Sequence, residues 1–159
     1  FYFFHNIKHM QNTISFNTRF GWITATEYKN TITEVRFKKG KNIGKKSKHL
    51  VVFKKNIYNY FNSKINKIKS PIKIIGNNSQ KKIWKNILKI KKGETKSYGY
   101  LARKLSFSPR YIGKVCAENK LLLIIPCHRV IKSNGDLGGY SASGGLKLKK
   151  KLLNFEKEK

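Results

Sequence analysis

Acidic residues are scarce in this sequence. Only 7 of its 159 residues are Asp or Glu, against 36 Lys and Arg, which gives a formal net charge of +29. A positive potential of this size attracts polyanions and speeds their capture. Nucleic acid is therefore the expected partner, with a merely solvated basic surface as the alternative. An anionic membrane fits less well, because the sequence contains no basic helix with a clean apolar face.

Cysteine is nearly absent as well. Cys116 and Cys127 are the only two, which excludes a disulfide framework, and no CxxC spacing indicates a zinc site. We therefore expect reduced thiols in a cytoplasmic protein, with no metal and no other cofactor. No apolar run approaches the length that spans a membrane.

The sequence opens with "FYFFHNIKHM", which lacks the features of a signal peptide. It has no basic start, no long apolar stretch and no small-residue cleavage site. Met10 is the only methionine of the chain. We expect the natural start to lie there, and residues 1–9 to be a non-native or disordered leader.

Apolar residues are abundant enough for a folded core: 39% of the chain is hydrophobic and 13% aromatic. Residues 13–38 alternate apolar and polar side chains around Lys29-Asn30, which predicts a strand hairpin with its turn there. A helix is predicted next, from the spacing of Leu50, Phe53, Ile57 and Phe61. The segment "SPIKIIG" then predicts a short strand, so residues 10–76 are expected to form an α/β scaffold domain.

Residues 77–159 are expected to form a second, mostly helical domain. It opens with the polar segment "NNSQKK", which we interpret as a loop at the boundary. A helix that Gly93 ends is predicted next. Its apolar stripe consists of Ile83, Trp84, Ile87 and Leu88.

Two further short helices have the pattern of a helix-turn-helix motif. The first is predicted over residues 98–105. The second opens with Ser108 as N-cap and Pro109 at its first position, and it carries Arg110 and Lys114. Most short helical hairpins are only packing units, but in a chain of this charge the pattern favours DNA binding.

The stretch "LLLIIPCHRV", residues 121–130, joins an aliphatic run to a thiol and an imidazole. We predict a buried strand, in which Pro126 keeps Ile125 extended. Neighbours in a strand point to opposite faces, so contact between Cys127 and His128 needs a turn or an intervening water. A histidine can lower the pKa of a cysteine and make it nucleophilic, whereas a buried structural cysteine is the plainer alternative.

The string "IPCHRV" resembles the active-site signature of the O6-alkylguanine-DNA alkyltransferases, also called methylated-DNA–protein-cysteine methyltransferases. The resemblance runs from about Gln80 to Glu156 and includes "IWKNILKIKKGETKSYGYLA", "SPRYIGKVCAEN", "IPCHRVIKSNGDLGGYSASGG" and "LKKKLLNFE". It implies an α+β fold with a ribonuclease H-like N-terminal domain and a winged-helix-like, DNA-binding C-terminal domain. It also implies a monomer that acts on alkylated double-stranded DNA.

Catalytic roles follow from this resemblance. Cys127 aligns with the cysteine that accepts the alkyl group, and His128 with the histidine that acts as base through a water. Glu156 falls where a glutamate orients that histidine. Asn119 matches an asparagine that braces the turn before the active-site segment, and Tyr98 a tyrosine that contacts the flipped base and donates a proton.

The resemblance also assigns DNA contacts to the second short helix. Arg110 matches the side chain that fills the gap left by a flipped nucleotide. Ser108, Tyr111 and Lys114 are further candidate DNA contacts. Tyr111 departs from the pattern, because a small residue would fit a minor groove more easily.

The expected base pocket involves residues on both sides of the "GGYSASGG" loop. A backbone carbonyl at Val130 would read the guanine amino group, and the amide of Ser141, beside Tyr140, would meet O6. Two extra residues in the loop leave Ser143 as an alternative to Ser141. Cys116 is the fourth candidate for the pocket.

The predicted activity is stoichiometric transfer of a methyl or larger alkyl group from O6-alkylguanine to Cys127, with O4-alkylthymine as a second candidate substrate. The thioether product has no easy route back to a thiol, so each molecule would act once. The main alternative is a non-enzymatic, alkyltransferase-like damage-binding protein, against which the presence of Cys127 argues. A cysteine hydrolase and a basic nucleoid-type binder are weaker alternatives.

Overall fold

The computed structural model describes residues 11–158, and the predicted leader over residues 1–9 lies outside them. The chain divides into two compact units, Phe1–Ile74 and Ile75–Lys159. Each unit has its own core and its own type of architecture.

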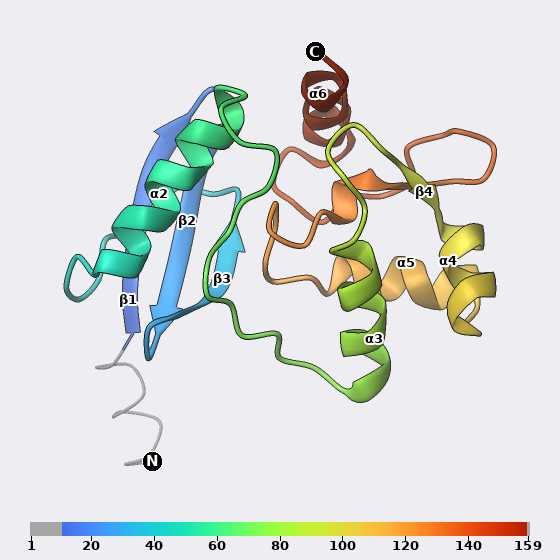
Figure 1. The fold of residues 1–159 in the computed structure, drawn as a ribbon, viewed down its shortest axis with the longest axis horizontal. Helices are drawn as coiled ribbons and strands as arrows, with labels where there is room; N and C mark the ends of the chain where they lie inside the picture. Colours follow the sequence, from blue (N-terminus) through green and yellow to red (C-terminus); the bar gives the residue numbers. More distant parts are fainter. Residues whose placement is uncertain (1–10, 159) are drawn as a thin grey trace. The chain divides into compact units, whose positions relative to one another are not determined.

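A three-stranded antiparallel sheet forms the centre of the first unit (Figure 1). Its strands are β1 (Gln11–Thr18), β2 (Gly21–Tyr28) and β3 (Thr31–Arg36), with β2 in the middle. The predicted turn at Lys29-Asn30 is confirmed: both residues have positive φ, 46° and 63°, as a tight two-residue hairpin requires.

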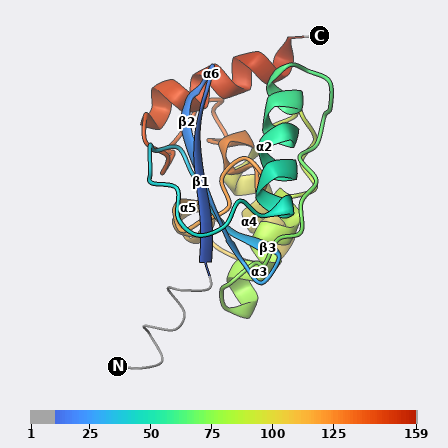
Figure 2. The ribbon, with the colours of Figure 1, turned by 90° about the vertical axis from the view of Figure 1, so that its left-hand side faces the viewer.

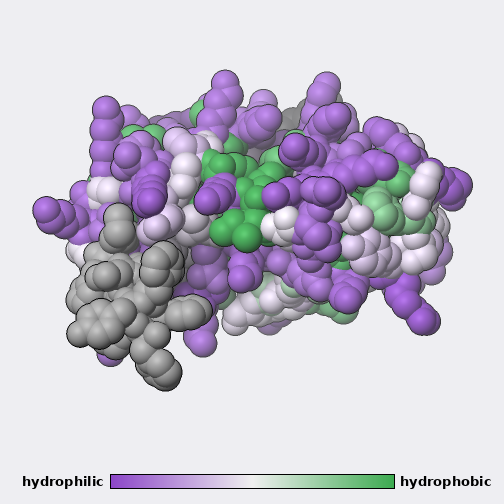
Figure 3. All heavy atoms as spheres, turned by 90° about the horizontal axis from the view of Figure 1, so that it is seen from below, coloured by the Kyte–Doolittle hydropathy of each residue, from purple (hydrophilic) through white to green (hydrophobic). Residues whose placement is uncertain are grey.

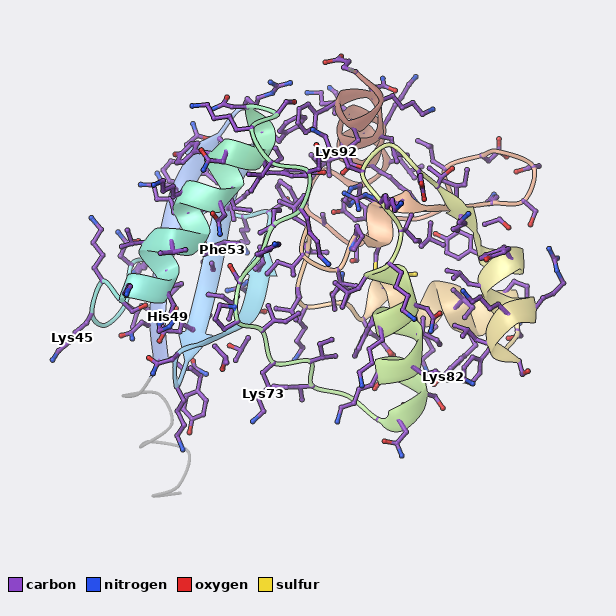
Figure 4. All side chains as sticks on the ribbon, in the orientation of Figure 1. Lys45, His49, Phe53, Lys73, Lys82 and Lys92 are labelled. Atoms are coloured by element: carbon purple, nitrogen blue, oxygen red, sulfur yellow. The ribbon has the colours of Figure 1, made fainter. Side chains whose placement is uncertain are left out.

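Helix α2 (Lys48–Phe61) lies across one face of this sheet (Figures 1 and 2). Ser47 caps its first turn by accepting a hydrogen bond from the Leu50 amide. The predicted apolar spacing is confirmed, because the residues that it named are all buried. Phe53 points toward the sheet, whereas Lys45, just before the helix, extends away from the ribbon (Figure 4).

The predicted strand over residues 70–76 is wrong. The segment makes only one bridge, at Ile72, in which the Ile32 amide donates to the Pro71 carbonyl and the Lys73 amide donates to the Ile32 carbonyl. Pro71 has no N–H to donate, and Ile75 is 65% exposed. The segment therefore lacks both the hydrogen bonds and the buried face that would extend the pairing.

The second unit is mostly helical. In chain order it contains α3 (Asn78–Ile87), β4 (Lys96–Ser97), α4 (Tyr98–Leu105), α5 (Pro109–Ala117), the 3₁₀ turn η1 (Cys127–Arg129), β5 (Val130–Ile131) and α6 (Gly145–Lys157). Strands β4 and β5 pair in parallel, and α6 packs against η1. These short pairings hold the "PCHRV" segment between helices that are distant in sequence.

Both predicted limits of the first helix of this unit are wrong. Helix α3 starts inside "NNSQKK", because Asn77 and Gln80 form a reciprocal capping box. It ends at Ile87. The Ile90 amide donates to the Ile87 carbonyl three residues earlier, so the α-helical hydrogen-bond pattern stops there. Gly93 lies beyond the helix, in a separate turn with φ +83°.

The predicted pair of short helices is confirmed as α4 and α5, which pack side by side (Figure 1). Ser106 ends α4 in a left-handed conformation, with φ 61°. Ser108 is the N-cap of α5, as predicted, and accepts a hydrogen bond from the Tyr111 amide. Trp84 of α3 donates to the Val115 carbonyl at 3.0 Å and so ties α5 to the rest of the unit.

Hydrophilic side chains cover most of the face shown in Figure 3. Among the described residues, no helix has the length and apolar character needed to cross a membrane.

Candidate functional site

Residues 121–130 are buried throughout, but they do not form the predicted strand. Leu123 has a φ of +69°, and the Ile125 amide turns back to the Leu121 carbonyl at 2.9 Å. At Pro126 (φ −81°, ψ 62°) the Cys127 amide donates to the Ile125 carbonyl at 2.8 Å, an inverse γ-turn. Proline suits this turn because its ring fixes φ near that value. Two consecutive turns, rather than a strand, therefore deliver Cys127.

Because Cys127 opens the 3₁₀ turn η1, the next side chains leave the backbone in different directions. Cys127 lines a cavity, whereas His128 and Arg129 point inward to Glu156 of α6. The Nδ1 atom of His128 is buried and has no hydrogen-bond partner within residues 11–158. The turn is present, but it directs the two side chains apart, so contact between Cys127 and His128 needs an intervening water.

Glu156 holds a buried ion cluster. Its Oε1 lies 2.6 Å from His128 Nε2, and its Oε2 accepts from Arg129 Nε at 2.8 Å. Arg129 also donates from Nη2 to Oε1 at 3.1 Å and from Nη1 to the Ile90 carbonyl at 2.6 Å. Burial alone would raise the pKa of Glu156, but His128 and then Arg129 hold it well below its ordinary value.

The protonation of His128 follows from this cluster. An ionised Glu156 can only accept, so His128 Nε2 carries the hydrogen and Nδ1 keeps its lone pair. Burial lowers the pKa of His128, although the bond to Glu156 opposes the shift. A neutral imidazole with a free Nδ1 lone pair is the form that can accept a proton.

Asn119 holds the Cys127 thiol in place. Its amide nitrogen donates to the Ile125 carbonyl at 2.9 Å and to Cys127 Sγ at 3.3 Å, and its oxygen accepts from the Leu121 amide at 2.8 Å. Burial raises the pKa of Cys127, and the neighbouring Cys116 thiol adds to the rise. The Asn119 hydrogen bond and the charge of Lys149 oppose it.

Lys149 is a site residue that the sequence analysis missed. Its ammonium group is buried and donates to the carbonyls of Val130 (2.6 Å), Leu137 (2.5 Å) and Gly139 (3.0 Å). It also reaches Tyr98 Oη at 3.4 Å. Burial lowers the pKa of Lys149 to about 8, although the two thiols oppose this shift. The only available signal was its helical spacing from Leu152 and Leu153, because a run of lysines hides one that points inward.

A cavity of about 560 Å³ lies in front of the thiol. Its lining brings together Tyr98, Cys116, Cys127, Tyr140 and Ser141, all of which were predicted site residues. Burial raises the pKa of Tyr98 to about 12, with smaller contributions from Cys116 and Cys127, so its phenol stays protonated. The Tyr140 hydroxyl is buried and has no hydrogen-bond partner among the described residues.

Close approach of the backbone shapes one wall of this cavity. Gly138 has a φ of +68°, and a Cβ there would lie 2.9 Å from the Tyr98 ring. Ser143 is exposed and does not line the cavity. Val130 is buried and does not line the cavity, and its carbonyl accepts a hydrogen bond from Lys149. Of the two serine alternatives, only Ser141 therefore faces the cavity.

The predicted DNA contacts lie on the first turns of α5, outside the lining of the cavity. Arg110 and Lys114 are exposed, whereas Tyr111 packs against Phe107 with ring centroids 5.2 Å apart. The Ser108 hydroxyl is used as the helix cap. Within residues 11–158, no cluster of three or more metal-ligating side chains occurs.

The sequence matches a known family over the second unit. Residues 78–158, half of the chain, match the family described as "6-O-methylguanine DNA methyltransferase, DNA binding domain". A methylated-DNA–protein-cysteine methyltransferase of Metallosphaera sedula is 41% identical over 103 residues, which are 64% of this chain and 64% of that protein. One of Saccharomyces cerevisiae (strain YJM789) is 37% identical over 119 residues, 70% of this chain and 62% of that protein. The chain thus spans less than two thirds of these relatives.

Solved structures match more of the chain. Mycobacterium tuberculosis OGT in complex with DNA superposes with a TM-score of 0.79 at 27% identity, covering 91% of this chain and 92% of that one. An O6-methylguanine DNA methyltransferase of Methanococcus jannaschii has a TM-score of 0.67 at 27% identity, covering 92% and 94%. Both units therefore have counterparts in solved structures.

Proposed function

The chain belongs to the 6-O-methylguanine DNA methyltransferase family, and we propose on this basis that it repairs DNA by moving an alkyl group from O6-alkylguanine to its own Cys127. The observation that carries the proposal is the cavity-facing Cys127 thiol, held by Asn119 and backed by the buried His128–Glu156 pair. O4-alkylthymine is a second proposed substrate.

The proposed domain organisation follows the same family. Residues 10–76 would be a ribonuclease H-like scaffold and residues 77–159 a winged-helix-like, DNA-binding alkyltransferase domain. This division is supported by the first unit, which combines a sheet with a helix, and by the α4–α5 pair of the second unit. A monomer in the cytoplasm is proposed, which agrees with the free thiols of both cysteines.

The reaction would be a single displacement. A water between Cys127 Sγ and His128 Nδ1 passes the thiol proton to the imidazole, which Glu156 keeps oriented. The thiolate attacks the alkyl carbon, the C–O6 bond breaks, and its electron pair stays with the guanine. Tyr98 donates its phenolic proton to the leaving guanine, since its high pKa keeps that proton available in the resting state. The product is a stable thioether, so the protein is consumed.

Access to the base requires that the nucleotide leave the duplex, because O6 is hidden in the stack. Exposed Arg110 at the start of α5 would fill the vacated space, and Lys114, Tyr111 and Ser108 would contact the backbone nearby. In the cavity, the Ser141 amide would meet O6 beside the Tyr140 ring.

The test is the intact mass of the protein after incubation with a duplex oligonucleotide that carries O6-methylguanine. The wild type should gain one methyl group in place of a hydrogen. Cys127→Ser should gain nothing, whereas Cys116→Ser, which keeps the acceptor thiol, should still become methylated. A Cys127→Ser protein that gains the methyl group would refute the assignment, and tight binding without any mass gain by the wild type would favour a damage-binding protein.

A further inference from the structure

A second thiol lies in the same cavity as the acceptor. Cys116 and Cys127 both line it, both are free, and they are only 8% and 3% exposed. Nothing in the displacement described above uses Cys116. Two thiols at one small cavity can be oxidised to a disulfide, which a single thiol cannot form within one molecule.

The packing brings the two cysteines to one part of the cavity wall. Cys116 is in the last turn of α5, and its carbonyl accepts a hydrogen bond from the Asn119 backbone amide at 3.3 Å. The Asn119 side chain in turn donates to Cys127 Sγ at 3.3 Å. Asn119 therefore contacts both cysteines, and both line the same cavity.

We propose that Cys116 and Cys127 form a reversible disulfide when a small peroxide enters the cavity, a modification site that reversibly blocks the acceptor. The formation of the bond is independent of the proposed function, whereas its effect on alkyl transfer rests on it. The cavity, at about 560 Å³, admits hydrogen peroxide with ease.

The chemistry takes place in two balanced steps. The Cys127 thiolate attacks one oxygen of hydrogen peroxide, the O–O bond breaks, and a sulfenic acid and hydroxide form, the hydroxide taking up a proton to give water. The Cys116 sulfur then attacks the sulfenic sulfur, the S–O bond breaks, and the oxygen leaves as a second water with the thiol proton. Two thiols are oxidised to one disulfide and one peroxide is reduced to two waters.

The environment sets the conditions for this step. Burial raises the pKa of Cys127, so the thiolate fraction, and with it the rate of oxidation, should rise toward alkaline pH. Because Cys116 lines the same cavity as the sulfenic sulfur, its thiol competes with further oxidation to sulfinic acid. A dithiol reductant should then restore both thiols.

Methylation of Cys127 and disulfide formation exclude each other. A protein that has accepted an alkyl group has no thiol at residue 127 and cannot close the bond. A protein in the disulfide form has no acceptor thiol and cannot take an alkyl group. Oxidation would thus hold an unused molecule in a recoverable form.

The experiment treats the full-length protein with a few equivalents of hydrogen peroxide at pH 8 and measures its intact mass without DNA. The monomer should lose the mass of two hydrogens, and peptides digested without reductant should show residues 116 and 127 cross-linked. Cys116→Ser should instead gain oxygen atoms at Cys127, and protein already methylated should keep its mass. Each variant is checked for its fold by circular dichroism before oxidation.

The outcomes distinguish failure of the disulfide from failure of the proposed alkyl transfer. Two results would overturn the proposed disulfide. One is that oxygen adducts form on Cys127 of the wild type as fast as on Cys127 of Cys116→Ser. The other is that cross-links form only between two molecules. Methyl transfer is then measured with the oxidised protein and with the same sample after reduction, where loss and full recovery are expected. If the reduced wild type accepts no methyl group at all, the proposed function fails while the disulfide result stands.

Discussion

Replacing Glu156 with Gln removes the negative charge that His128 and Arg129 share, while keeping the size of the side chain. The carboxylate accepts from His128 Nε2 at 2.6 Å and from Arg129 Nε at 2.8 Å, and its side chain is 0% exposed. The uncharged amide cannot balance the buried guanidinium of Arg129. Removing one partner of a buried ion pair costs about 3–5 kcal/mol, and we expect the lower end because the amide oxygen still accepts one bond.

The assay is thermal and urea unfolding of Glu156→Gln beside the wild type, with Glu158→Gln as control, since Glu158 is exposed two residues further on. A loss of about 3 kcal/mol lowers Tm by roughly 10 °C in a chain of this size. Methyl transfer should also slow by roughly 10²-fold, because His128, the proposed base, loses its hydrogen-bonded carboxylate. Equal unfolding midpoints for the two variants would refute the argument that the buried charge is uncompensated.

The stability that Glu156 contributes should depend on pH. The pKa of Glu156 in the folded protein lies well below its ordinary value, so its contribution to stability is fully present above the pKa of the unfolded chain, about 4.3. That contribution is lost as the pH falls from there toward the folded pKa. The difference in unfolding free energy between wild type and Glu156→Gln should therefore shrink below about pH 4. A difference that stays constant from pH 6 to pH 3 would contradict the shift.

Three other changes test the site. Asn119→Ala leaves the Ile125 carbonyl and Leu121 amide buried without that partner, so it should destabilise the protein by about 2 kcal/mol or more in urea unfolding; a change below about 0.5 kcal/mol would count against this role. Lys149→Met removes a charge that lowers the pKa of Cys127, so the rise of the transfer rate with pH should move to higher pH, and an unmoved profile would contradict it. Arg110→Ala should weaken binding to a duplex that carries O6-methylguanine, because no long side chain then fills the vacated space, whereas an unchanged affinity would remove Arg110 from the interface.

Features determined by local chemistry could be predicted from the sequence. The hairpin turn at Lys29-Asn30 and the start of α5 at Ser108-Pro109 depend on few residues, and both were found. The string "IPCHRV" led to the Cys127 site through its resemblance to a family. Local backbone preferences and a short motif therefore account for much of the fold and for the position of the proposed acceptor thiol.

Features determined by tertiary packing could not be predicted in the same way. Residues 121–130 look like a strand because they are aliphatic, but their hydrogen bonds close turns. Lys149 looks like any other lysine until α6 turns it toward three carbonyl groups of the segment from Val130 to Gly139. The presence of Cys116 and Cys127 in one cavity likewise depends on where α5 ends relative to η1.

The most direct test of the central claim is the stoichiometry and position of the transferred group. The protein is incubated with a large excess of O6-methylguanine duplex, then digested and sequenced by tandem mass spectrometry, while the repaired duplex is counted. We predict one methyl group per molecule, located on Cys127, and one repaired guanine per molecule of protein however much duplex is added. Repair that continues beyond one equivalent, or a methyl group on any other residue, would contradict the account.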